Sequence, residues 1–201
     1  MDTPDDIARE EWMSDLVDRI SKEAVDQFTF ERLRSYYRDN REVAVNAVTV
    51  FREAERLHEQ SPTAALVLYT TAIELGLKVA LLKPVIYGLV HNESIADLVS
   101  DLAVKHNGFD RFKPLLTSIL AEYGEIDFTV FTIDGHKKTI WEEITLLQGR
   151  RNAVVHRGEL PTAEDADLAK QVAIMIFGNF FVSILSGLGL TYVKGGHITD
   201  A

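Results

Sequence analysis

The 201-residue chain contains no cysteine, which excludes a disulfide scaffold and thiolate metal sites. It also lacks internal repeats, low-complexity tracts and any linker rich in proline, glycine or serine, having only five prolines in all. The first residues lack the basic and apolar regions of a signal peptide. With 46% hydrophobic residues the chain can bury a substantial core, and we expect a globular cytoplasmic protein.

Positive charge is scarce but unevenly distributed. The net charge is −10, which at first argues against a nucleic-acid partner. Residues 1–31 hold ten acidic and three basic side chains, so this segment carries −7 and the rest of the chain only −3. Residues 136–157 carry a local +3, because five basic side chains oppose two glutamates. The acidic total therefore leaves room for a local anion site.

The apolar periodicity predicts an all-α fold. We expect a helical bundle over residues 59–201, and an acidic N-terminal helical extension over residues 1–58 that packs on this core. Ser61-Pro62 should begin a helix that Pro84 ends or kinks, Gly158 should cap a helix, and Thr162 should begin the last one. The other expected helices are 5–25, 30–58, 93–105, 109–123 and 138–157.

Two stretches depart from this pattern. Residues 126–138 combine β-branched and aromatic residues with an Asp134-Gly135 pair, which predicts a small β-hairpin or an extended arm. Residues 172–190 contain no charge, and Lys170 and Lys194 flank them. This length would span a membrane, but Asn179, two serines and three glycines interrupt the stretch, which favours a core helix over a membrane anchor.

The most informative segment is GRRNAVVHRGE, residues 149–159. On a helix, Arg151 falls on the same stripe as Leu147 and Val155, where an apolar side chain is expected. Three interpretations stay open. Arg151 pairs with a buried carboxylate such as Glu74, the helix bends at Gly149, or the stripe opens into a cleft where Arg151 meets a ligand anion.

The neighbours of Arg151 favour the third interpretation. Asn152 and His156 are four residues apart and share a helix face. Histidine exchanges protons near neutral pH, so an arginine, an amide and an imidazole form a usable chemical set. We interpret His58, His91, His106, His136 and His197 as structural. Their spacing gives no metal motif, and we expect neither a metal nor another cofactor.

At these residues the chain resembles the HEPN superfamily. The signature of that family is an arginine, often followed by asparagine, and a histidine four to six residues on. Here it reads Arg151-Asn152-Ala153-Val154-Val155-His156, between two apolar helices. The resemblance covers roughly residues 62–187. It implies a helical bundle that forms a homodimer with the motif at the two-fold groove.

The resemblance also implies an activity, metal-independent endoribonuclease cleavage, often in toxin–antitoxin or phage-defence systems. His156 would transfer protons, Arg151 would stabilise charge, and Asn152 would orient the phosphate or the imidazole. Cleavage by the ribose 2′-hydroxyl would leave 2′,3′-cyclic phosphate and 5′-hydroxyl ends. Other members of the family are inactive modules that bind RNA, a nucleotide or a protein. In one toxin subgroup a tyrosine lies two residues after the histidine, where this chain has Gly158, so a partner that modifies such a tyrosine is not expected.

Further basic residues form the expected RNA-binding surface: Arg150, Arg157, Lys137 and Lys138. The alternative for Arg150 and Arg157 is a solvated surface that pairs with Glu143 or Glu159. Glu74 and Lys78 are four apart and suit a simple ion pair, although Glu74 could instead position Arg151. Besides RNA, an antitoxin or another regulatory protein is an expected partner, and a membrane is not.

Overall fold

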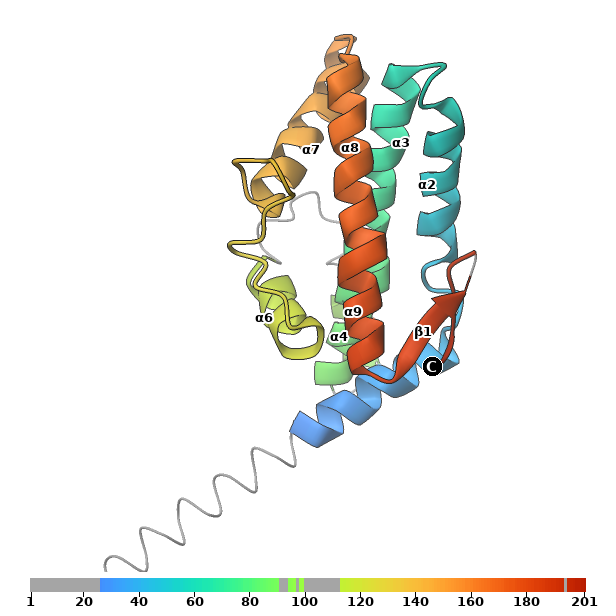
Figure 1. Ribbon diagram of the computed structural model, residues 1–201. Coiled ribbons are helices and arrows are strands. Elements are labelled where there is room, and N and C mark those ends of the chain that lie inside the picture. The colour runs from blue at the N-terminus through green and yellow to red at the C-terminus, as the bar shows by residue number, and fades with distance from the viewer. Residues whose placement is uncertain (1–25, 91–93, 97, 100–112, 194) are drawn as a thin grey trace, which may run out of the picture.

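Two long apolar helical rods lie side by side and run in the same direction (Figure 1). The structure is a computed structural model, and it describes residues 26–90, 94–96, 98–99, 113–193 and 195–201. The first rod joins α3 (Pro62–Leu75), η1 (Gly76–Leu82) and α4 (Lys83–Leu89). The second joins α8 (Ala163–Ile174), η3 (Met175–Phe180) and α9 (Phe181–Gly187). Three further helices flank the rods: α2 (Val45–Leu57) along α3, α7 (Ile140–Arg157) beside α8, and α6 (Lys113–Gly124) against α9. The prediction of a mostly helical fold is confirmed.

Short polar side chains begin the helices where the sequence predicts. The Ser61 hydroxyl accepts a hydrogen bond from the Ala64 N–H at 3.3 Å, and Pro62 occupies the first turn of α3. Thr162 begins α8 with a capping box closed by Asp165. These caps satisfy backbone N–H groups that have no partner within the helix.

Each rod contains one π-helical turn, and the two turns meet. A Cβ atom on Gly76 would lie 3.0 Å from the Phe177 ring, so glycine is needed for this close approach of η1 to η3. The backbone N–H of Lys83 bonds to the Lys78 carbonyl, five residues back. Of the two outcomes predicted at Pro84, an end or a kink, the end does not occur, because the wider turn before it lets the rod continue to Leu89.

The predicted helix 30–58 is broken. A helix over 26–39 ends in turns at 40–44, and α2 then begins in a new direction. The Asn40 side chain donates to the Tyr36 carbonyl at 2.9 Å, which competes with helix continuation. The break buries Ala44 and Tyr37 completely, so tertiary packing outweighs the helical propensity of the segment.

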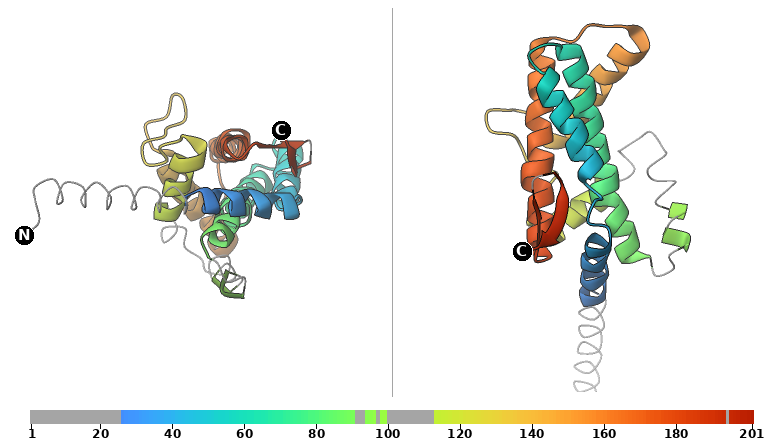
Figure 2. Two further views of the ribbon diagram at one scale, coloured as in Figure 1. Left: turned by 90° about the horizontal axis from the view of Figure 1, so that it is seen from below. Right: turned by 90° about the vertical axis from the view of Figure 1, so that its right-hand side faces the viewer.

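Helix 26–39 crosses the lower end of the two rods (Figure 2). Leu33 and Tyr37 belong to the same hydrophobic core as the rods. The Tyr37 hydroxyl donates to the Ala80 carbonyl at 2.7 Å, and burial raises the pKa of this phenol. Arg32 donates to the carbonyls of Tyr87 and Val90 at the end of α4. This part of the predicted extension therefore helps to close the bundle.

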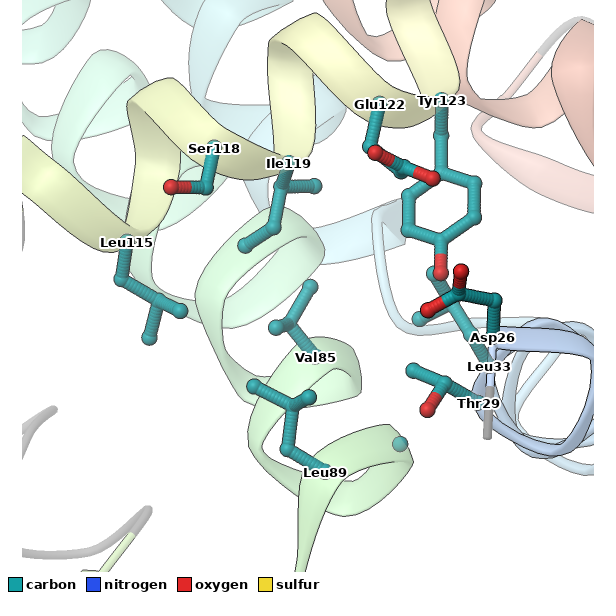
Figure 3. A pocket seen from close by; sticks show the side chains of 11 residues that line it. Asp26, Thr29, Leu33, Val85, Leu89, Leu115, Ser118, Ile119, Glu122 and Tyr123 are labelled. Atoms are coloured by element: carbon teal, nitrogen blue, oxygen red, sulfur yellow. The ribbon is translucent and has the colours of Figure 1, made fainter. Parts of the chain in front are cut away.

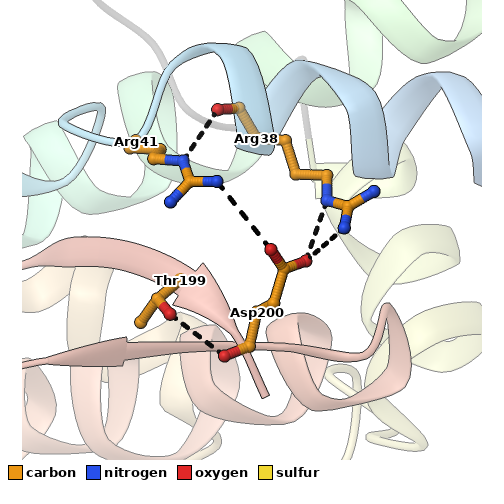
Figure 4. A network of polar contacts seen from close by, with 4 residues as sticks. All are labelled: Arg38, Arg41, Thr199 and Asp200. Atoms are coloured by element: carbon orange, nitrogen blue, oxygen red, sulfur yellow. Dashed lines mark hydrogen bonds and ion pairs between the residues drawn. The ribbon is translucent and has the colours of Figure 1, made fainter.

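The β-hairpin lies at 190–200 and not at 126–138. Strands β1 (Leu190–Val193) and β2 (His197–Asp200) pair antiparallel around Gly195 and Gly196, which both adopt positive φ. Arg38 and Arg41 hold Asp200 at 2.6 and 3.8 Å and fix the hairpin to helix 26–39 (Figure 4). For residues 126–138 the sequence predicts a small hairpin or an extended arm; the structure has no strand pair in this fully described segment, only an isolated antiparallel bridge between Thr132 and Thr139, and the segment buries Phe128.

The remaining predictions fall partly outside the described residues. Helix 5–25 lies outside them, as does most of helix 93–105, whereas helix 109–123 is represented by α6. Both rods, Pro62–Leu89 and Ala163–Gly187, are long and apolar enough to cross a membrane by length and composition alone. In the most apolar 18-residue stretch of each rod, 67% of the first and 50% of the second is buried in the bundle. The core helix of a globular protein can have the same length and composition.

Candidate functional site at the C-terminal end of α7

Helix α7 carries the arginine–histidine motif on a regular helix that is capped at both ends. Thr139 and Glu142 form a capping box at its start, and the Glu142 carboxylate accepts from the Thr139 N–H at 2.7 Å. This hydrogen bond and a second one from the Thr139 hydroxyl lower the pKa of Glu142. Gly158 ends the helix in the left-handed conformation, with φ 66°, as predicted. The helix does not end at Gly149, because α7 is continuous from Ile140 to Arg157.

The buried stripe of α7 shifts before it reaches the motif. Ile144 and Leu147 are buried as predicted, but Val155 is 52% exposed. Eight residues at 100° each place Val155 about 80° away from Leu147. Val154, about 20° from Leu147, packs partly buried against the core, and the small Ala153 is 4% exposed. Arg151, about 40° from Leu147 around the helix axis, is partly buried.

The Arg151 guanidinium has no acidic partner among the described residues. Its Nη1 donates to the Asn152 side-chain oxygen at 3.1 Å, whereas its buried Nε has no hydrogen-bond partner. The described residues include no ion pair between Glu74 and Arg151. An ionic group at the edge of a core, held only by a neutral amide, retains donors for an anion.

Asn152 and His156 are exposed on one face of the last two turns. His156 makes no hydrogen bond or ion pair with the described residues. Because α7 stays helical through Arg157, the five-residue separation places Arg151 and His156 about 140° apart around the helix axis. One copy of the chain therefore presents the two side chains to different directions.

The other predicted cations are not gathered at one place. Arg150 Nε lies 3.4 Å from Asp165 at the start of α8, and Arg157 donates to Glu159 at 2.5 Å. The hydrogen bond and the charges of this second pair raise the pKa of Arg157 and lower that of Glu159. Both arginines are thus partly neutralised.

Lys137 and Lys138 are exposed at the opposite end of α7. The thirteen residues from Lys138 to Arg151 correspond to about 20 Å of helix. The structure therefore does not bring these lysines to the motif within one copy.

Two features beside the motif escaped the sequence-based prediction. Val155 and Leu160 are apolar and exposed, Leu160 to 86%. From Gln171 to Ser186 the outer face of the second rod is also uncharged, whereas Glu164 and Asp167 are exposed in its first two turns. Its exposed residues recur at three- or four-residue spacing: Gln171, Ile174, Gly178, Val182 and Ser186. The sequence signal for this face is the absence of charge in residues 172–190. A fully buried helix would show the same absence of charge.

Histidines outside the motif contact acidic side chains. His58 Nε2 lies 2.9 Å from Asp167, which links the α2–α3 turn to α8, and His136 Nδ1 lies 3.2 Å from the buried Glu143. Glu143 is therefore not the partner of Arg150 or Arg157. Burial, with the nearby carboxylates Glu55 and Asp167, raises the pKa of Tyr69 to about 12. No cluster of three or more metal-ligating side chains occurs within the described ranges.

No model of a protein family, no curated protein and no solved structure matches this chain. A functional assignment consequently rests on the motif and on the geometry around it.

Proposed function

We propose that the chain is a HEPN-type endoribonuclease that cleaves RNA without a metal or other cofactor. One observation carries the proposal: Arg151 lies at the edge of the core without an acidic partner among the described residues, next to the exposed Asn152 and one turn before the exposed His156. Stability alone would favour an apolar residue or a paired arginine at this position. An RNA phosphate supplies the missing anion.

The roles of the three side chains follow from RNA chemistry. His156 removes the proton from the ribose 2′-hydroxyl, and the resulting oxygen attacks the adjacent phosphorus. Arg151 stabilises the charge on the phosphoryl oxygens, and Asn152 orients Arg151 through the hydrogen bond between them. The bond from phosphorus to the 5′-oxygen breaks, and that oxygen takes up a proton. The products are a 2′,3′-cyclic phosphate and a 5′-hydroxyl, and no water is activated.

We further propose that two copies form the working site. Within one copy the 140° separation leaves Arg151 and His156 facing different directions. A second copy that packs along the uncharged stretch from Gln171 to Ser186, with its rods in the same direction, would bring a second motif to the same end of the bundle and supply both an acid and a base. The exposed Val155 and Leu160 suit such an interface. A cytoplasmic toxin or phage-defence effector with a protein antitoxin fits this activity.

The proposal is tested with purified protein and single-stranded RNA in EDTA. We expect His156→Ala and Arg151→Ala each to lower the cleavage rate by about 10²-fold or more. His197→Ala and Arg56→Ala remove an exposed histidine and an exposed arginine elsewhere, and they should leave the rate unchanged. Cleavage that persists in His156→Ala, or that disappears in His197→Ala, contradicts the assignment.

The shared site has its own test. Val182→Glu places a charge on the uncharged face and should produce a monomer without cleavage activity. Mixing Arg151→Ala with His156→Ala should restore part of the activity, because mixed dimers combine one intact side chain from each copy. A fully active monomer would refute the two-copy site.

A second candidate function is a catalytically inactive HEPN module that binds RNA, a nucleotide or a protein partner. The pairing of Arg150 and Arg157 with acids, together with the exposed Leu160, favours a protein surface at this end of α7. Unchanged RNA with retained binding would select this function over the enzyme.

A further inference from the structure

A chamber with apolar walls lies between helix 26–39, α4 and α6, at the end of the bundle opposite the motif (Figure 3). Its volume is about 230 Å³. Five aliphatic side chains form its walls: Leu33, Val85, Leu89, Leu115 and Ile119. Gly88 lines the chamber as well, where a Cβ atom would lie 3.6 Å from Leu33. The interior thus favours an apolar group of a ligand.

The rim of this chamber is acidic. Asp26 and Glu122 point toward each other across the mouth, beside the Tyr123 ring (Figure 3). A neighbouring depression of about 390 Å³ shares these three residues and adds Phe30 and Glu125. None of the described residues that line either hollow is basic. The rim therefore attracts cations and repels anions.

Two aromatic rings stand at the same rim. The centroids of Phe30 and Tyr123 lie 6.4 Å apart, with their planes inclined by 43°. Aromatic faces attract ammonium groups, most strongly those with methyl substituents. Burial raises the pKa of Tyr123, and the neighbouring carboxylates Glu122 and Asp26 raise it further. Carboxylates and ring faces together are the groups that recognise an organic ammonium ion.

We propose that this chamber is a binding site for an amphiphilic organic cation, an alkylammonium compound. Its apolar chain fills the space between Leu33, Val85 and Ile119, and its ammonium group lies at the rim between Asp26, Glu122 and Tyr123. A neutral apolar ligand would leave the carboxylates unused, and a fatty acid would be repelled by them. The site is independent of the proposed ribonuclease activity.

The test is isothermal titration of the full-length protein with four probes. Octyltrimethylammonium should bind with one site per chain. Octanol lacks the charge, octanoate reverses it, and tetramethylammonium lacks the chain, so each should bind about tenfold more weakly or not at all. Spermidine is a cation without a terminal apolar chain, and it should also bind weakly. This weak binding would distinguish the chamber from a site that binds polyamines in general.

Two variants locate the binding. Glu122→Gln should weaken octyltrimethylammonium about threefold to fivefold, as expected for one exposed charge pair. Glu59→Gln, an exposed acid at the other end of the bundle, is its matched control and should change nothing. Ser118→Phe fills the mouth from an exposed position and should abolish binding with little change in the melting temperature.

Several results would overturn the proposal. Equal affinity for octanol and octyltrimethylammonium would show that charge plays no part. Equal affinity of the wild type and Ser118→Phe would show that the probe binds elsewhere. Absence of binding by every probe would show that the chamber accepts no ligand of this class.

Discussion

Replacing Arg151 by leucine should stabilise the fold and abolish function. The side chain is partly buried on α7, four residues after the buried Leu147. Its buried Nε has no hydrogen-bond partner, and a buried unsatisfied donor costs about 1–3 kcal/mol. Arg151→Leu removes this donor and adds apolar contact, while it gives up one exposed hydrogen bond to Asn152 that is worth about 1 kcal/mol.

The balance of these terms is a gain of about 1 kcal/mol. In a chain of this length such a gain raises the melting temperature by about 2–4 °C. Urea denaturation at one fixed protein concentration measures it, because a dimer would make the midpoint depend on concentration. The same protein should show no cleavage of RNA.

Arg150→Leu is the matched control. It breaks the contact with Asp165 at the α8 capping box and should cost up to about 1 kcal/mol. If Arg151→Leu were instead destabilised by 2 kcal/mol or more, Arg151 would be a structural residue. The reasoning that connects it to an external anion would then be wrong.

Three further predictions concern the helices that hold the site. Phe180→Ala should cost about 3–5 kcal/mol in calorimetry, because this buried ring packs edge-on against Phe128 and Phe131; a loss below 1 kcal/mol would mean that the second rod is not a core helix. Gly158→Ala should cost about 1 kcal/mol and loosen the last turn of α7 in hydrogen exchange, because φ is +66° and no steric contact surrounds the position; unchanged exchange would contradict this. Stability should fall as the pH drops below the ordinary glutamate value of 4.5. The folded-state pKa of Glu142 is lowered by its contacts with the N–H and hydroxyl of Thr139, so its contribution is complete above the unfolded pKa and is lost as pH falls through the folded pKa. Urea midpoints from pH 7 to 3 measure the loss, and a Thr139→Ala variant with an equally steep pH dependence would contradict the assignment.

Local chemistry made the helix ends predictable from the sequence. Ser61, Gly158 and Thr162 each cap a helix through their own side chain or backbone conformation, and this depends only on the adjacent residues. Residues whose environment comes from distant segments could not be assigned in this way. The break at 40–44 is stabilised by burial of Tyr37 under the rods, with its hydroxyl on Ala80.

The sequence itself carries a signal for the hairpin at 190–200. Residues 190–193 and 197–200 contain β-branched residues on both sides of a Gly195-Gly196 pair, which is a typical hairpin pattern. Its position depends on distant contacts, because a Cβ atom on Gly196 would approach Val48 at 3.0 Å.

The sequence correctly predicts that Arg151, Asn152 and His156 lie near the end of one helix. It does not predict which side chains surround them. A straight helical stripe puts Arg151 and Val155 in the core, whereas in the structure Arg151 is only partly buried and Val155 is exposed. The pairing of Arg150 with Asp165 depends on the position of α8, which no local pattern specifies. The distance of Lys137 and Lys138 from the motif follows directly from the unbroken length of α7.

The most direct test of the proposed ribonuclease is the chemistry of the RNA ends that the wild-type protein produces in EDTA. Mass spectrometry of the fragments should find 2′,3′-cyclic phosphates at the cut 3′ ends and hydroxyls at the new 5′ ends. Intact RNA, or fragments with 3′-hydroxyl and 5′-phosphate ends, would contradict attack by the 2′-hydroxyl with His156 as the proton-transfer group.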